Sequence, residues 1–172
     1  MSTIITLQAV TAENWRAVGE LRVRDEQADY VAPNLYSLVE AAYGFPGELA
    51  HLVLTPLAVY AGLTLVGFTL YNSSPALNRF FIMRLMVDQR YQGQGYGSAA
   101  VRLLLQLFQA HPQATEAAIS YNAGNVAARQ VYLRCGFEEL PTENEGEVLM
   151  WRTLNPHPKP WTSLWNPAWA GR

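Results

Sequence analysis

The chain has 172 residues, which favours a single domain and is long enough to bury a hydrophobic core. Half of the residues are hydrophobic and 15% are charged, a composition that excludes an intrinsically disordered chain. The net charge of −2 argues against a general nucleic-acid-binding protein, which would carry a surplus of basic residues. We therefore expect a globular protein with no nucleic-acid partner.

The cysteine and histidine content excludes further classes. Cys135 is the single cysteine, so no internal disulfide is possible, and this fits a reducing cytosol. The N-terminus lacks the basic and apolar segments of a signal peptide, and no uncharged apolar stretch is long enough to span a membrane. His51, His111 and His157 lack metal-ligand spacing. We therefore expect a cytoplasmic protein without membrane association or a metal.

Two helices are predicted near the N-terminus, after an alternating segment, residues 2–10, that predicts a strand. Thr11 is a good N-cap, and apolar residues follow it at helical spacing, so we expect a helix from there to about residue 29. The end of this helix is acidic, with Asp25, Glu26 and Asp29. A second helix follows Pro33, which suits a first helical position, and stops at Gly44.

Strands dominate the middle and the end of the chain. Segments 57–63 and 65–71 are rich in β-forming residues and predict a hairpin with a turn near Gly62. A strand is also predicted over residues 79–87, and others over residues 116–121, 137–140 and 147–153. A helix that ends at about residue 110 and another over residues 125–134 separate these strands.

Gly93, Gly95 and Gly97 lie between the strand 79–87 and the helix that follows. Glycine lets the backbone turn sharply and approach a ligand closely, and a helix that begins there offers unpaired N–H groups and a positive dipole end. No acidic residue appears between Gln89 and Gln106. These features predict a phosphate-binding loop, and the alternative is a simple turn. The spacing matches neither a P-loop nor a Rossmann motif.

A second motif, Asn-x-x-Ala-x-x-x-Tyr-x-x-x-Gly-Phe, runs from Asn125 to Phe137. Asn125 suits the N-cap of a helix, Ala128 and Tyr132 lie on one face of it, and Gly136 suits its end. Five residue types at fixed spacing rarely match by chance, so this motif carries more information than the glycine loop.

The two motifs together, with Gln-x-x-Gly-x-Gly at residues 92–97, resemble the GNAT superfamily of acetyl-CoA-dependent N-acetyltransferases. The order of the predicted elements matches that fold from about residue 4 to residue 154. The resemblance implies an α/β (α+β) fold. Its central sheet is mixed and mostly antiparallel, with six or seven strands, four helices, and splayed strands at 80–87 and 116–121. Segments 26–38 and 84–88 further resemble bacterial spermine/spermidine (diamine) acetyltransferases.

The resemblance implies acetyl-CoA as co-substrate, with its pantetheine arm between the splayed strands near Met86 and Val87. The N–H of Val87 would stabilise the oxyanion of the reaction. Asn125 and Ala128 would contact the cofactor arm, and Tyr132 would protonate the leaving thiolate; the alternative for Tyr132 is a core aromatic. The backbone of seven residues would hold the pyrophosphate: Gln92, Gly93, Gln94, Gly95, Tyr96, Gly97 and Ser98.

The acceptor is expected to be a small cationic amine, with a polyamine or diamine as the first choice. An ammonium group must lose a proton before it can attack. The carboxylate that many polyamine acetylators carry on the strand before the glycine loop is replaced here by Met83. Glu26 is therefore a candidate base and substrate-binding residue, and the alternative is ordered water with backbone carbonyls.

Further acceptor-site candidates are Tyr30, Asn34, Tyr71 and Arg84. Tyr71 is equally suited to the core, and Arg84 to an ion pair with an acid of the first helix. Asp25, Asp29 and Glu40 are weaker candidates for a cation-binding rim. Other possible acceptors are an amino acid, an antibiotic amine or a protein N-terminus. A non-catalytic acyl-CoA-binding module is the alternative to an enzyme, and it would not need the hydroxyl of Tyr132.

Residues 1–154 are expected to form the acetyltransferase domain and residues 155–172 a tail of different composition. The tail combines four prolines with Trp161, Trp165 and Trp169, and the prolines exclude a long helix. It is expected to be extended, with its rings docked on this subunit or a neighbour. A role in covering substrate is the alternative. We expect a homodimer.

Overall fold

The computed structural model of the protein describes residues 3–74, 78–111, 113–144 and 146–155. The strands are β1 (Ile5–Ala9), β2 (Val53–Ala61), β3 (Thr64–Ser74), β4 (Arg79–Val87), β5 (Glu116–Asn122), β6 (Glu138–Asn144) and β7 (Glu147–Thr153). The α-helices are α1 (Trp15–Glu20), α2 (Asn34–Tyr43), α3 (Tyr96–Gln109) and α4 (Val126–Arg134). Short 3₁₀ helices are η1 (Asp25–Tyr30), η2 (Gly47–Leu49) and η3 (Gln89–Tyr91).

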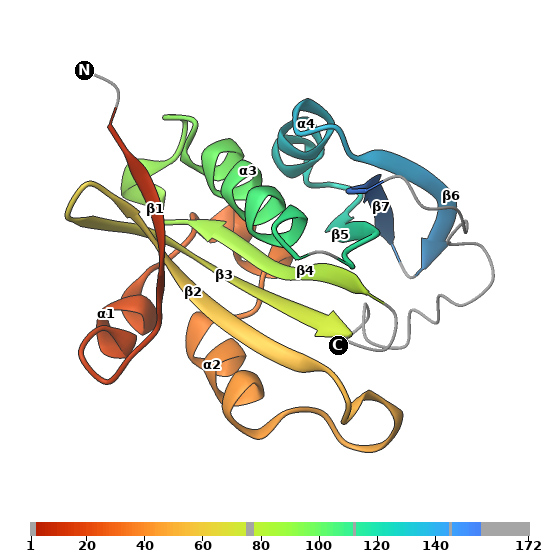
Figure 1. The fold of residues 1–172 in the computed structure, drawn as a ribbon. Helices are drawn as coiled ribbons and strands as arrows, with labels where there is room; N and C mark the ends of the chain where they lie inside the picture. The colour runs from red at the N-terminus through yellow and green to blue at the C-terminus, as the bar shows by residue number, and fades with distance from the viewer. Residues whose placement is uncertain (1–2, 75–77, 112, 145, 156–172) are drawn as a thin grey trace.

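One mixed sheet contains all the strands of the described residues, in the order β1–β2–β3–β4–β5–β7–β6 (Figure 1). Every neighbouring pair is antiparallel except β4 and β5, which run parallel. The expected α/β (α+β) class, mostly antiparallel sheet and four α-helices are therefore confirmed. The predicted hairpin is also confirmed, and Gly62 adopts a positive φ of 59° in its turn.

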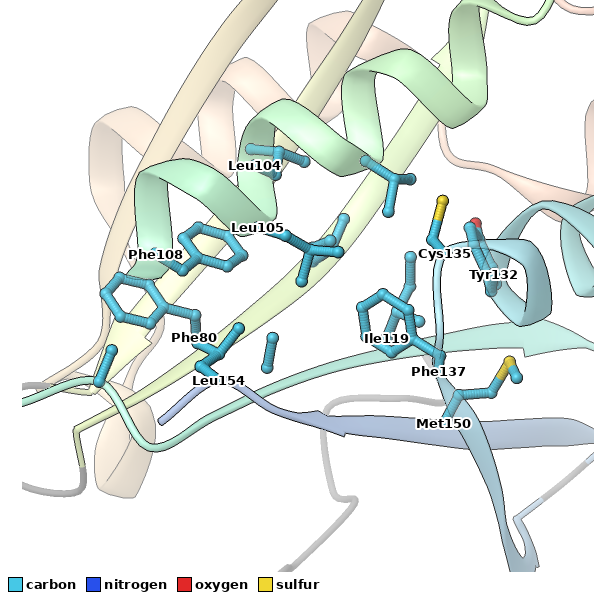
Figure 2. Close-up of a cluster of buried hydrophobic side chains, with 14 of the residues drawn as sticks. Phe80, Leu104, Leu105, Phe108, Ile119, Tyr132, Cys135, Phe137, Met150 and Leu154 are labelled. Atoms are coloured by element: carbon cyan, nitrogen blue, oxygen red, sulfur yellow. The ribbon is translucent and has the colours of Figure 1, made fainter. Parts of the chain in front are cut away.

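Helices cover both faces of the sheet (Figure 1). Helix α3 lies on one face, where it buries Ala100, Val101, Leu104, Leu105 and Phe108. Except for Ala100, these side chains form the largest core cluster with residues of β4, β5, α4 and β7 (Figure 2). Helices α1 and α2 lie on the other face, against β2 and β3. Full burial of one such aliphatic or aromatic side chain stabilises the fold by about 1.5–3 kcal/mol, so the two cores hold the sheet between its helices.

The predicted helix from residue 11 to about residue 29 is wrong at both ends, because α1 begins at Trp15, with Asn14 and not Thr11 as its N-cap, and stops at Glu20. Leu21 leaves the helical region with ψ 140°. The backbone N–H of Arg22 donates to the carboxylate of Asp88, and the carbonyl of Arg22 accepts from the N–H of Gln89. These long-range hydrogen bonds replace helical ones, and the next helical segment of the chain is η1.

Two other expectations concern the ends of the chain and its environment. The tail from residue 156 onward, with its tryptophans, lies outside the described residues. Among the helices that the structure describes, none has the length and the apolar character needed to cross a membrane.

Candidate active site

Strands β4 and β5 separate along their length, and a cleft opens between them. They pair only from Arg79 to Ile82, opposite Glu116 to Ile119. At the closed end the buried side chains of Arg79 and Glu116 form an ion pair at 3.0 Å. The register of β3 and β4 shifts beside Met83, and such a bulge bends a strand locally. The resulting cleft has a volume of about 840 Å³ and is lined by β4, β5, η1, α4 and the loop before α3.

The backbone of Val87 faces this cleft. Asp88 donates its N–H to the carbonyl of Val66, so these two residues form a hydrogen-bonded antiparallel pair. The next pair, Gly67 and Val87, is then of the non-hydrogen-bonded type, in which the backbone polar groups point away from the partner strand. The N–H and carbonyl of Val87 are therefore directed toward the side where β5 has moved away. The carbonyl accepts a hydrogen bond from Gln92 Nε2 at 3.0 Å.

The glycine loop begins α3 in the predicted place. Gly93 and Gly95 have φ angles of 80° and 82°, which L side chains rarely adopt, and a Cβ at either would meet open space. In this part of the described chain, no side chain caps α3, and its first turn carries no acid. The first N–H groups of the helix consequently remain available beside the cleft. The loop has the geometry of an anion-binding helix terminus.

Segment η1 spans the cleft from one rim to the other. Gln27 accepts a hydrogen bond from Gln92 Nε2 at 2.8 Å, which attaches η1 to the glycine loop. Tyr30 donates its hydroxyl to the carbonyl of Gly124 at 3.3 Å, which attaches η1 to the turn before α4. Tyr30 is thus brought to the cleft, as expected, although its ring is partly exposed.

Tyr132 reaches the cleft from α4. Asn125 caps this helix by accepting from the N–H of Ala128 at 3.1 Å, as predicted, and both residues also line the cleft. Burial raises the pKa of Tyr132 well above its usual range, so the hydroxyl is protonated throughout the physiological range. Figure 2 shows the hydroxyl of Tyr132 beside the sulfur of Cys135, which is a free and buried cysteine.

Sequence reasoning missed Glu147, the first residue of β7, which lines the same cleft. Its carboxylate accepts a hydrogen bond from the hydroxyl of Ser120 at 2.9 Å. Burial raises the pKa of Glu147, while the hydrogen bond from Ser120 and the charge of Arg84 act in the opposite direction. No local sequence signal marks this residue, because the β5–β7 register alone brings it to the cleft.

Arg84 lines the cleft as expected, but its ion-pair partner is in a different helix from the one suggested by the sequence. Its guanidinium lies 3.7 Å from the carboxylate of Glu40, which belongs to α2 rather than α1. Burial raises the pKa of Glu40, and the charge of Arg84 lowers it. Glu40 is therefore engaged in this ion pair, and it does not line the cleft.

Several predicted site residues lie elsewhere. Glu26 is exposed on η1 and does not line the cleft, and Asp29 of the same segment does. Tyr71 packs on Phe108 in the core, with 5.0 Å between the ring centres. Asn34 is buried, and its side chain donates to the carbonyl of Val18 at 2.9 Å, a structural role that the sequence did not indicate. Of the seven loop residues, Gln94 alone does not line the cleft.

Comparison with known proteins identifies the family. The model of the acetyltransferase (GNAT) family matches residues 15–137. The chain belongs to this family. It is a GNAT N-acetyltransferase with acetyl-CoA as its co-substrate, as the two motifs implied.

Relatives of this GNAT protein act on various amines. It is 28% identical over 140 residues to the spermine/spermidine N(1)-acetyltransferase of Bacillus subtilis, and the match covers 78% of this chain and 88% of the relative. The structure of spermidine N-acetyltransferase from Vibrio cholerae with CoA and spermine has a TM-score of 0.67 at 15% identity, over 87% of this chain and 95% of that one. An aminoglycoside acetyltransferase in complex with coenzyme A has a TM-score of 0.69 at 20% identity, with the same coverage. The two structures show the same fold.

Proposed function

We propose that this enzyme transfers the acetyl group of acetyl-CoA to a primary amine of a small, multiply charged cation, of the polyamine or diamine class. The observation that carries this proposal is a pair of acidic residues, Asp29 and Glu147, in the lining of the cleft. Asp25 and Glu26 lie on the same η1 segment as Asp29. Two carboxylates in one cavity, with further acids on the adjoining segment, favour a ligand with more than one positive charge. The Bacillus subtilis relative, named for spermine and spermidine, supports the same class.

In this proposal, acetyl-CoA binds where β4 and β5 separate. The unpaired N–H groups at the start of α3 bind the pyrophosphate, and the pantetheine arm runs along β4 between the two strands. Gly93, Gly95 and Gly97 keep the path of the backbone free of side chains, and Asn125 contacts the arm from the start of α4. The thioester then lies between Val87 and Tyr132.

The proposed reaction is direct attack of the amine on the thioester. The neutral amine adds to the carbonyl carbon, and the N–H of Val87 donates to the oxyanion that forms. The C–S bond breaks as the intermediate collapses. Tyr132 gives its proton to the departing thiolate, because its hydroxyl is protonated at neutral pH and has a proton to donate.

The release of free thiol from acetyl-CoA, measured with a panel of amines, tests this function. The panel contains spermine, spermidine, a short diamine, a monoamine, an amino acid, an aminoglycoside and a peptide with a free N-terminus. We expect kcat/KM to be highest for the polyamines or the diamine. A preference for one of the last three would reassign the acceptor. Tight CoA binding without turnover on any amine would indicate a non-catalytic acyl-CoA-binding module.

The homodimer and the cytoplasmic location stay predictions. Size-exclusion chromatography with light scattering measures the first, and fractionation of the producing cell measures the second. A monomer at the concentration of the kinetic assay would contradict the first prediction without affecting the proposed reaction.

A further inference from the structure

The two faces of β5 present different chemistry to the cleft. Ile119 and Tyr121 belong to the cluster beneath α3 and α4, which also contains Tyr132. Ala118 belongs to a cluster on the opposite face. Because side chains alternate along a strand, Ser120 lies on the face of Ala118, away from Tyr132. Ser120 is also the first residue of β5 beyond its last pair with β4.

Glu147 shares the face of Ser120. Asn122 pairs with Glu147 and Ser120 with Leu149, so Ser120 and Glu147 are diagonal neighbours on adjacent strands. The hydrogen bond of 2.9 Å from Ser120 fixes one carboxylate oxygen of Glu147. The carboxylate is therefore held at the point where β4 and β5 begin to separate, and on the side of the sheet opposite to Tyr132.

Charged and titratable groups around Glu147 come from each neighbouring element. Those that line the cleft together with Glu147 are Asp29 and Tyr30 of η1, Arg84 of β4, Tyr91 of η3, Tyr96 of α3, Tyr121 of β5, and Tyr132 and Arg134 of α4. Arg84 acts on Glu147 through its charge and is itself paired with Glu40 of α2. Tyr121 donates its hydroxyl to Glu139 at 2.6 Å and faces away from Glu147. The nearby cation thus belongs to an existing ion pair, and Glu147 retains capacity to accept hydrogen bonds.

We propose that Glu147 binds the reacting ammonium group of the acceptor and accepts its proton, with Ser120 as the residue that positions the carboxylate. This inference rests on the proposed function and adds the base that the sequence left open. The acceptor then approaches the thioester from the α1–α2 face, while the group that protonates the thiolate stands on the α3–α4 face. The thioester then lies between the separated strands β4 and β5, and groups on both faces of the sheet reach it.

The proton balance of this step is complete. The ammonium N–H bond breaks and its proton moves to the carboxylate of Glu147, which leaves the neutral amine with a free electron pair. That pair forms the C–N bond, and the C–S electron pair leaves with sulfur. Tyr132 protonates the thiolate, and its phenolate recovers a proton from the amide nitrogen. Glu147 finally releases its proton to water, so one proton reaches solvent for each acetyl group transferred.

The decisive variant is Glu147→Gln, which keeps the shape and removes the proton acceptor. We expect kcat/KM for the amine to fall by roughly 10²–10⁴-fold, the usual contribution of a general base, with the dissociation constant for CoA unchanged. Glu138→Gln, on the adjacent strand β6 and exposed, is the matched control and should keep wild-type rates. Thermal unfolding of both variants shows whether either has lost its fold.

The pH dependence supplies a second, independent measurement. In the wild type, kcat/KM should fall as the pH drops through the raised pKa of Glu147, because a protonated carboxyl cannot accept a proton. Ser120→Ala removes a hydrogen bond that lowers this pKa, so the acidic limb should move to higher pH while the plateau is largely kept. A merely structural role for Ser120 would leave the position of the limb unchanged.

The outcomes separate this inference from the proposed function. Suppose that the wild type turns over amines and that Glu147→Gln keeps near-normal rates and the full acidic limb. Glu147 would then not be the base, and the proposed acetyltransferase activity would stand. A wild type that turns over no amine would overturn the proposed function itself. If Ser120→Ala leaves the limb in place, Ser120 does not position the base.

Discussion

Gln92 connects the glycine loop to η1 by donating its side-chain amide to Gln27 at 2.8 Å, across 65 positions of sequence. The same amide donates to the carbonyl of Val87 at 3.0 Å, so one side chain contacts the proposed donor site and the segment that spans the cleft. This contact gives the Gln-x-x-Gly-x-Gly motif a second task. Its first residue orders η1 above the cleft, besides shaping the loop.

The first prediction concerns this pair. Gln92→Ala should raise KM for acetyl-CoA and for the acceptor together, because both sites lose an ordered neighbour. A double-mutant cycle of Gln92→Ala and Gln27→Ala, followed by denaturant unfolding, should give a coupling energy of about 0.5–1.5 kcal/mol. Gln106→Ala, at an exposed position of α3, is the control. Fully additive effects would show that the hydrogen bond carries no coupling.

Asp88 gives a prediction on stability and pH. Burial acts to raise its pKa, but hydrogen bonds from the Arg90 side chain and from the backbone N–H groups of Arg22 and Arg90 outweigh it and lower the pKa. A carboxyl with a depressed folded-state pKa stabilises the fold above its unfolded pKa and loses this contribution as the pH falls through the folded value. Asp88→Asn should therefore lower the free energy of unfolding by about 1–3 kcal/mol at pH 7, mainly through the backbone bonds, since Arg90 is largely exposed.

Denaturant unfolding across pH measures this effect. The difference between Asp88→Asn and the wild type should begin to shrink below about pH 4, the ordinary pKa of the unfolded state, and should be lost as the pH falls through the lowered pKa of the folded state. Glu20→Gln, on the exposed side of α1, should show little difference at any pH. A constant difference down to the lowest pH would mean that packing, and not the ionised carboxylate, is responsible.

Tyr132→Phe tests the proposed general acid. It removes one oxygen and keeps the ring that packs on Tyr121 and Phe137. We expect kcat to fall by roughly 10²–10⁴-fold, with the dissociation constant for acetyl-CoA nearly unchanged. Steady-state kinetics and calorimetric binding measure the two quantities. If the variant keeps the kcat of the wild type from about pH 6 to pH 9, Tyr132 does not protonate the thiolate.

Two glycines of the loop should respond in opposite ways to the same substitution. Gly97 lies within α3, and an added Cβ would be 3.8 Å from Val87 Cγ2, an ordinary contact. Gly97→Ala should therefore stabilise the fold by about 0.5–1 kcal/mol, yet weaken CoA binding, because the methyl group occupies the proposed path of the pyrophosphate. Gly95→Ala should destabilise the fold by about 1–2 kcal/mol through its φ of 82°.

Thermal unfolding and CoA titration of both glycine variants provide the measurement. If Gly97→Ala increases stability and leaves the CoA affinity unchanged, the pyrophosphate does not bind at the start of α3. The paired design separates strain in the loop from obstruction of the ligand, because of these two positions only Gly95 has a positive φ that would strain an alanine.

The sequence predicted the local structure of the glycine loop and of α4 better than the positions of the proposed acceptor-site residues. The glycine loop and the cap of α4 by Asn125 depend on neighbours within a few residues, so their patterns are visible locally. The same is true of Gly136, whose φ of 79° ends α4 as its position indicated. Family membership of residues 15–137 then supports the order of the elements around these motifs.

The acceptor side depends on contacts between distant segments. Asn34 is buried because Val18, 16 positions earlier, accepts its hydrogen bond, and Tyr71 enters the core because the β3–β4 register brings it beside Phe80. Glu147 reaches the cleft only through the antiparallel pairing of β5 and β7. None of these relationships leaves a periodicity or spacing in the sequence, so an acidic run such as Asp25 and Glu26 was the more visible signal.

The most direct test of the central claim is mass spectrometry of spermidine after incubation with acetyl-CoA and the purified protein, beside a measurement of released thiol. We expect a monoacetylated amine, formed in a one-to-one ratio with free CoA. Thiol release without an acetylated amine, or CoA binding with neither product, would contradict it.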